Sequence, residues 1–295
     1  MNIDYLNPNI VNQLDNLYLK AKTIVEGYMS GIHKSPYHGF SVEFSEHRSY
    51  GIGDEVKNID WKIWSKTDKL YVKRFEEETN LISHIFLDSS KSMEFSSTNI
   101  TKFQYSKIIA AALSYLMVAQ KDAIGLYAFD SKINLEIPPK GNKTHLNNIL
   151  TEIDKIKLGE DTNISQILHL GAEKIKKRGL IILISDLFDE PKKVMNSLKH
   201  FKYNHNEVLV FQVLDPLEIS LDYNQNTIFQ DLETNETIET EPWHIKADYQ
   251  KQMSETLDYY KTECAINKID YHLLTINKNL NYALSKFLKK RQKSF

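Results

Sequence analysis

This sequence of 295 residues contains a single cysteine, Cys264. One cysteine cannot form an internal disulfide framework and excludes most thiolate metal sites, so the chain suits a reducing compartment. A strong excess of one charge is also lacking, because 37 Lys and Arg residues stand against 39 Asp and Glu residues, for a net charge of −2. That balance gives no general indication of nucleic acid or of an acidic substrate as a partner.

Long apolar runs are missing as well. No stretch approaches the roughly 18 uninterrupted apolar residues that a membrane helix needs. The first residues, interrupted by Asp4, Asp15 and Lys20, lack the basic leader and apolar run of a signal peptide. We therefore predict a cytoplasmic protein without membrane insertion. The HExxH, GxxxxGK[ST] and GxSxG motifs do not occur either, which argues against the zinc, phosphate-loop and serine-hydrolase sites that they mark.

Segments of strand and helix character alternate from residue 81 onward. Hydrophobic residues make up 41% of the chain, enough for a well-buried core. The run 180–184 is continuously apolar, which is typical of a central strand in a parallel sheet. The alternation predicts a doubly wound, mostly parallel α/β sheet with helices on both faces. We expect strands at 82–87, 123–129, 132–137, 180–184, 207–214 and 269–275, and helices at 108–118, 145–156, 164–176, 191–201, 247–260 and 280–290.

Two parts of the sequence depart from this alternation. Residues 1–80 are predicted to form a small α+β extension, with one amphipathic helix over 10–28 and short strands near 40–44 and 70–75. Residues 81–295 are predicted to form the main domain. Within it, a β-hairpin near 227–240 is expected as an insertion before the helix at 247–260.

Oxygen-bearing side chains gather where a predicted buried strand ends. Asp88, Ser90 and Ser92 alternate in the loop after strand 82–87, Thr162 precedes a helix, and Asp186 follows the central strand. Ligands bind beyond the carboxyl ends of strands in open α/β sheets, so these five side chains are expected to meet. One or two carboxylates with hydroxyls suit Mg²⁺ or Mn²⁺ far better than zinc. The alternative is that Asp88 and Ser90 merely cap the following loop and helix.

The Asp-x-Ser-x-Ser segment with its later Thr and Asp resembles the metal-ion-dependent adhesion site of von Willebrand factor A domains. Segments 43–54, 58–61 and 72–78 are similar to the signature of a bacterial family, domain of unknown function 58 (DUF58). This resemblance implies a von Willebrand factor A-like domain and a partnership with a MoxR-type AAA+ ATPase. Lys91 inside the Asp-x-Ser-x-Ser loop departs from the pattern. Many relatives of this kind have membrane helices, but we do not expect membrane attachment for this chain.

Two functions remain open at this stage. In the favoured one, the chain is a non-enzymatic binding module whose metal ion, held by Asp88, Ser90, Ser92, Thr162 and Asp186, takes an acidic side chain from a partner protein. The alternative is a Mg²⁺- or Mn²⁺-dependent hydrolase acting on a phosphoester, for which the nearby spare acids are Asp161 and Asp189. Four further residues could form a second partner surface or could have a structural role, and we favour the structural role. These residues are Arg48, Asp54, Asp60 and Trp61.

Overall fold

Contacts divide the chain into two units, one formed by residues 1–31 with 81–295 and the other by residues 32–80. The predicted division into domains 1–80 and 81–295 stays a prediction. The structure is a computed structural model, and it describes residues 8–12, 14, 16–33, 47–49, 51, 64–65, 67, 70–73, 81–159, 163–223, 227–230, 237–240 and 242–293.

Six strands form the central sheet in the order β10-β7-β6-β3-β4-β5. All neighbouring pairs are parallel except β4 and β5, which form an antiparallel edge. From β3 the chain builds the sheet toward β5 and then returns to add β6, β7 and β10 on the other side. The strands are β3 (Ile82–Asp88), β4 (Ala123–Phe129), β5 (Ile133–Lys140), β6 (Leu180–Ser185), β7 (Glu207–Leu214) and β10 (Asp270–Thr275). The predicted doubly wound, mostly parallel sheet is confirmed, and its topological switch point lies between β3 and β6.

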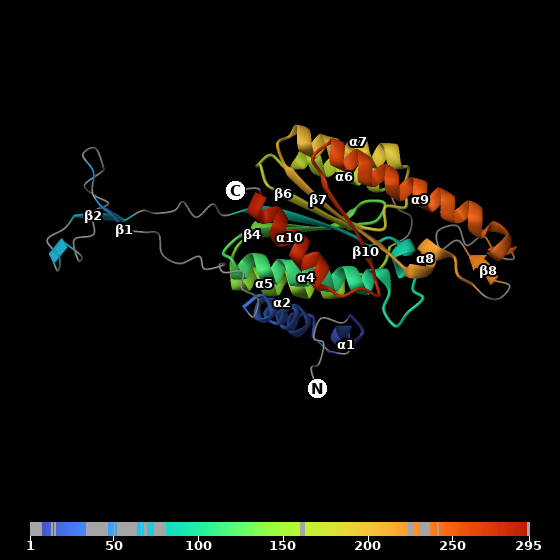
Figure 1. Ribbon diagram of the computed structural model, residues 1–295, viewed down its shortest axis with the longest axis horizontal. Helices are drawn as coiled ribbons and strands as arrows, with labels where there is room; N and C mark the ends of the chain where they lie inside the picture. The colour runs from blue at the N-terminus through green and yellow to red at the C-terminus, as the bar shows by residue number, and fades with distance from the viewer. Residues whose placement is uncertain are drawn as a thin grey trace. The chain divides into compact units, whose positions relative to one another are not determined.

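Helices cover both faces of this sheet (Figure 1). One layer contains α6, α7 and α9, and the opposite layer contains α4, α5 and α10. Several helix starts follow from local sequence: Thr101 and Gln104 form a capping box, and proline occupies the first turn of α7. The elements are η2 (Lys91–Glu94), α4 (Lys102–Ala119), α5 (Lys143–Lys155), α6 (Ile164–Lys174), α7 (Pro191–Tyr203), α8 (Pro216–Ser220), α9 (Pro242–Ile266) and α10 (Asn281–Lys293).

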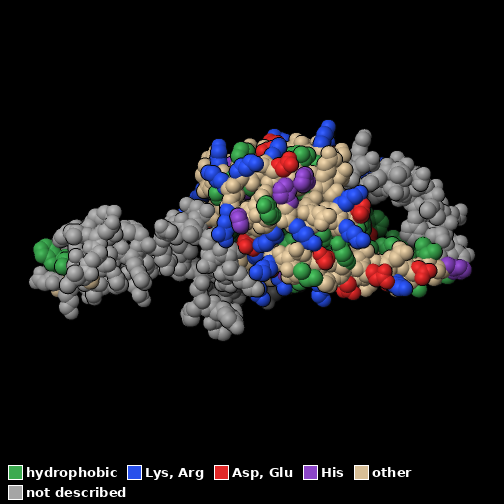
Figure 2. All heavy atoms as spheres, turned by 90° about the horizontal axis from the view of Figure 1, so that it is seen from above, with side chains coloured by type: hydrophobic (Ala, Val, Ile, Leu, Met, Phe, Trp, Pro, Cys, Tyr) green, Lys and Arg blue, Asp and Glu red, His purple; other side chains and the backbone are tan. Residues whose placement is uncertain are grey.

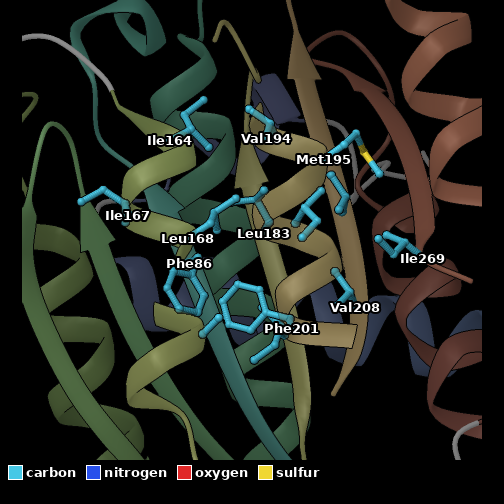
Figure 3. Close-up of a cluster of buried hydrophobic side chains, with 14 of the residues drawn as sticks. Phe86, Ile164, Ile167, Leu168, Leu183, Val194, Met195, Phe201, Val208 and Ile269 are labelled. Atoms are coloured by element: carbon cyan, nitrogen blue, oxygen red, sulfur yellow. The ribbon is translucent and has the colours of Figure 1, made fainter. Parts of the chain in front are cut away.

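The core between the sheet and the α6–α7 layer is packed around aromatic rings. Phe86 of β3 stacks on Tyr127 with ring centroids 4.6 Å apart and meets Phe201 of α7 edge-on at 5.6 Å. Figure 3 shows Leu168 of α6 and Leu183 of β6 in the same cluster. Because the strands of a doubly wound sheet are covered on both faces, β6 is buried along its whole length.

The N-terminal helical segment differs from its prediction. We expected one helix over 10–28, but the chain forms α1 (Pro8–Asn12) and α2 (Leu17–His33). Asn16 explains the break, because its side chain accepts a hydrogen bond from the backbone N–H of Tyr18 at 2.7 Å. Asparagine favours this local bond over continuing a helix. Tyr18 then meets Tyr115 of α4, with centroids 5.8 Å apart, so α2 lies against the helical layer rather than the sheet.

Within the described residues, two short antiparallel strand pairs are separate from the central sheet. In the second unit, β1 (His47–Ser49) pairs with β2 (Tyr71–Lys73), with Arg48 opposite Val72. β8 (Thr227–Gln230) pairs with β9 (Thr237–Thr240), which confirms the predicted hairpin. The strand expected near 40–44 falls outside the described residues.

Burial of His84 on β3 makes the stability of the fold depend on pH. Burial lowers the pKa of His84 to about 4, although the charge of Glu136 opposes the shift. Between pH 6.5 and 4 the unfolded chain binds a proton here that the folded chain does not, so stability falls as the pH falls. We expect about 1–2 kcal/mol to be lost at His84 between pH 7 and pH 5.

Urea denaturation at both pH values measures this loss by comparison with His84→Leu. The difference between the wild type and this variant isolates His84 from other groups that titrate in the same range. His244→Gln, a change at an exposed histidine of α9, serves as the control. An unchanged pH dependence in His84→Leu would contradict the assignment.

Candidate functional site

Asp88 is the last residue of β3 and lies at the switch point of the sheet. Its side chain is fully buried. Oδ1 accepts the backbone N–H of Ser90 at 2.9 Å, and Oδ2 accepts the hydroxyl of Ser185, the last residue of β6, at 2.6 Å. Because β3 and β6 are adjacent and parallel, the hydrogen bond from Ser185 ties their carboxyl ends together.

The loop after Asp88 brings two serine hydroxyls together. Ser90 Oγ and Ser92 Oγ are 3.0 Å apart, and either atom can be the donor. Ser89 points the other way, because its N–H and its hydroxyl both donate to the carbonyl of Phe129, at 2.8 and 2.9 Å. Its own carbonyl accepts the N–H of Gly159 at 2.7 Å. Ser90 and Ser92 are therefore in contact with each other, and Ser89 is bound to β4.

Asp186 follows β6 directly, and its side chain is also buried. Its Oδ1 accepts the backbone N–H of Phe188 at 3.2 Å. Its backbone carbonyl accepts the side chain of Gln212 on β7 at 2.8 Å. Burial and the charge of Asp186 raise the pKa of Asp88 to about 7, against the hydrogen bonds from Ser185 and Ser90. Two buried carboxylates within electrostatic reach of each other strongly favour a nearby positive charge.

A buried ammonium, which the sequence did not predict, contacts Asp186. Lys102 Nζ donates to Asp186 Oδ2 at 2.8 Å and to Glu218 Oε1 at 2.6 Å. Burial alone would lower the pKa of Lys102, but the charges of Asp186 and Glu218 outweigh it and raise that pKa. No sequence spacing predicts this contact, because Glu218 lies on α8, more than one hundred residues along the chain.

The loop after Asp186 holds a strained residue and exposes an aromatic ring. Leu187 is buried and has a φ of 60°, a left-handed conformation that is unfavourable for a bulky side chain. Its N–H donates to Ser185 Oγ at 3.0 Å, and its carbonyl accepts the hydroxyl of Tyr260 at 3.3 Å. The next residue, Phe188, is 43% exposed, and Lys102 Nζ lies 4.7 Å from its ring centroid.

These side chains fit a hard divalent cation. The described part of the chain contains no group of three or more His, Cys, Asp or Glu side chains that could hold a metal. Asp88 with the hydroxyls of Ser90 and Ser92 is an oxygen set of the kind that Mg²⁺ or Mn²⁺ accepts. Both Asp186 oxygens already accept hydrogen bonds from other donors, and the negative charge of Asp186 would add to that of Asp88 in attracting an ion.

Thr162, Asp54, Asp60 and Trp61 fall outside the described residues, and Arg48 is described only as part of β1. Their predicted roles stay predictions.

The spare acids that a hydrolase would need gain no support from the described residues. Asp189 Oδ2 accepts the backbone N–H of Ser165 in the first turn of α6 at 3.0 Å, and Oδ1 accepts the N–H of Glu190. Asp189 thus serves the start of α6, and Asp161 lies outside the described residues. Cys264 is buried beside Met195, and burial raises the pKa of its thiol to about 12, as expected for a packed rather than a reactive cysteine.

Comparison with known proteins places the chain among uncharacterised bacterial relatives. A family described as "protein of unknown function DUF58" matches residues 46–258, which is more than half of the chain. An uncharacterised protein of Mycobacterium bovis is 25% identical over 234 residues, covering 78% of this chain and 73% of the relative. An uncharacterised protein of Mycobacterium tuberculosis matches equally well.

A solved structure shares the fold. An aerotolerance-related membrane protein from Bacteroides fragilis superposes with a TM-score of 0.51 at 15% identity, over 72% of this chain and 99% of that one. The VWA domain of SpRpn10 matches with a TM-score of 0.42 at 10% identity, over 70% of this chain and 95% of that domain. The sheet order and its two helical layers form a von Willebrand factor A-like fold. Among the described residues, none of the helices combines the length and apolar character that crossing a membrane requires.

Proposed function

The chain belongs to the DUF58 family, and we propose that it is a non-enzymatic, metal-dependent protein-binding module. The observation that carries the proposal is the buried carboxylate of Asp88 at the switch point of the sheet. Ser90 and Ser92 supply hydroxyls beside it. The proposed ion is Mg²⁺ or Mn²⁺, with Thr162 and Asp186 completing the set of residues around it.

Recognition in this proposal relies on an incompletely neutralised ion. Serine hydroxyls are neutral ligands, so an ion held with them would keep positive charge and would attract an anionic oxygen. An Asp or Glu side chain of a partner protein would supply that oxygen, and no covalent bond would be made or broken. Figure 2 shows Lys and Arg side chains intermixed with Asp and Glu over the described residues of the visible face. Selectivity on such a surface depends on the local site rather than on a long-range field of one sign.

The proposed partner is a MoxR-type AAA+ ATPase, and the proposed location is the cytoplasm. The ATPase is suggested by the family resemblance, and it would remodel a client that the metal site holds. A phosphoester hydrolase is the less favoured function, because Asp189 is committed to backbone hydrogen bonds at the start of α6. Metal-dependent turnover of a phosphoester that is lost in Asp88→Ala would reverse this preference.

Phe188 is the exposed apolar side chain nearest in sequence to the proposed ligands. We expect Phe188→Ala to weaken partner binding about tenfold or more, because exposed aromatic residues beside a polar anchor contribute strongly to interfaces. Tyr203→Ala is the control, since Tyr203 is 83% exposed but ends α7, which leads into the opposite end of the sheet. Equal affinities for both variants would remove Phe188 from the binding surface.

Binding of the partner in the presence and absence of metal tests the proposed function. The purified protein is immobilised, and the MoxR-type ATPase of the same organism is passed over it in Mg²⁺ and then in EDTA. Binding that requires Mg²⁺ and is lost in Asp88→Ala supports the proposal. Binding that is equal in EDTA, or that survives in Asp88→Ala, contradicts it.

A further inference from the structure

Lys102 occupies a position in which a lysine is unfavourable on ordinary grounds. It is the first residue of α4, and a positive charge at a helix N-terminus opposes the helix dipole. Its side chain is 0% exposed, so the ammonium has also lost its hydration. Helix stability therefore does not explain a lysine at this position. The two carboxylates that Lys102 contacts do explain it.

The contacts of Lys102 bridge the candidate site and α8. Asp186 Oδ2 is 2.8 Å from Nζ on one side, and Glu218 Oε1 is 2.6 Å away on the other. The second oxygen of Glu218 accepts the N–H of Asp215 at 2.8 Å. Tyr249 of α9 donates its hydroxyl to the carbonyl of Glu218 at 2.6 Å. Glu218 is thus fixed on two sides, and it holds the ammonium against Asp186.

We propose that Lys102, held by Glu218, is a resident cation that shares Asp186 with the incoming divalent ion and so sets the affinity of the site. The inference rests on the proposed function, because it concerns the same ion. Lys102 and Glu218 are positioning residues in this scheme. The ammonium occupies Oδ2 of Asp186 and repels a second cation, whereas Glu218 offsets that repulsion.

This arrangement predicts effects of opposite sign. Removal of the ammonium by Lys102→Met leaves more negative charge for the ion, so Mn²⁺ should bind about ten- to hundredfold more tightly. Glu218→Gln leaves the ammonium without its second counter-charge, so Mn²⁺ should bind more weakly than to the wild type. A merely structural pair would behave differently, because loss of either partner would disturb the site in the same direction.

Calorimetric titration with Mn²⁺ alone, on the metal-stripped full chain at pH 7.5, measures these affinities. Lys107→Met is a matched control on the same helix. Lys107 also lies 4.7 Å from a phenylalanine ring centroid, that of Phe103, but it donates to the carbonyls of Asp154 and Ile156 instead of to carboxylates. We expect the affinity of the Lys107→Met variant for Mn²⁺ to match that of the wild type. Circular dichroism checks that each variant is folded.

The double variant Lys102→Met with Glu218→Gln removes the pair without leaving either charge unpaired. It should bind Mn²⁺ more tightly than Glu218→Gln alone, which keeps the test valid if Lys102→Met does not fold. Tighter binding by Lys102→Met, including binding where the wild type shows none, supports the inference. If the wild type binds Mn²⁺ through Asp88 but both single variants weaken or neither changes, the inference fails and the proposed function stands. If no variant binds, both fail together.

Discussion

Replacing Asp88 with Asn should abolish Mn²⁺ binding and at the same time stabilise the metal-free protein. Asn keeps an oxygen for the N–H of Ser90 but removes the charge that an ion needs. Burial and the charge of Asp186 raise the pKa of Asp88 to about 7, whereas in the unfolded chain it is close to 3.8. The folded state therefore binds more protons between these values, and the contribution of Asp88 to stability falls as the pH rises from about 4 to about 7.

At pH 7.5 the buried carboxylate opposes folding, so we expect Asp88→Asn to gain on the order of 1–3 kcal/mol in EDTA. The gain should shrink toward zero near pH 4. In Mn²⁺ the wild type should gain stability and the variant should not, because only a ligand that binds the folded state stabilises it. Thermal unfolding in EDTA and in Mn²⁺, together with calorimetric titration, measures both effects.

Asp122→Asn is the matched control, because Asp122 is equally buried but accepts the N–H of Leu81 at the opposite end of β3. It should lose stability and keep its affinity for Mn²⁺. Retained Mn²⁺ binding in Asp88→Asn would mean that the ion is held elsewhere.

Replacing Gly171 with Val should destabilise the fold by about 2–3 kcal/mol. Gly171 lies in α6 where the helix crosses Phe86, and a Cβ there would stand 2.7 Å from two atoms of that ring and 3.3 Å from Phe201. Any side chain must push α6 away from the sheet or force the stacked rings from their positions. Urea denaturation followed by circular dichroism measures the loss.

Leu170→Val provides the control for placing a β-branched residue in α6, since Leu170 is 40% exposed on the same helix. We expect it to change stability by less than about 1 kcal/mol. Phe86→Leu replaces the aromatic ring with a smaller side chain. Combined with Gly171→Val, it should recover part of the stability that Gly171→Val loses. An additive double variant would show that the clash at Phe86 is not the cause.

Local patterns of apolar residues in the sequence predicted most of the fold. The continuous apolar run at 180–184 corresponds to β6, and the Lys132–Ile137 segment does pair antiparallel with β4. The N-terminal helix was predicted as one segment because its apolar spacing continues through the break. That spacing is insensitive to the side-chain hydrogen bond of Asn16, which interrupts the helix.

The sequence by itself determined the sheet, the helical layers and the position of Asp88, Ser90 and Ser92 after a buried strand, because periodicity and strand ends are local properties. Tertiary structure alone decided that Lys102 stands between Asp186 and Glu218, and that Ser185 contacts Asp88. These contacts join residues on different elements, 84, 116 and 97 positions apart. The charges of Lys102, Asp186 and Glu218 are stable when buried only because folding brings these partners together. No local sequence pattern predicts that pairing.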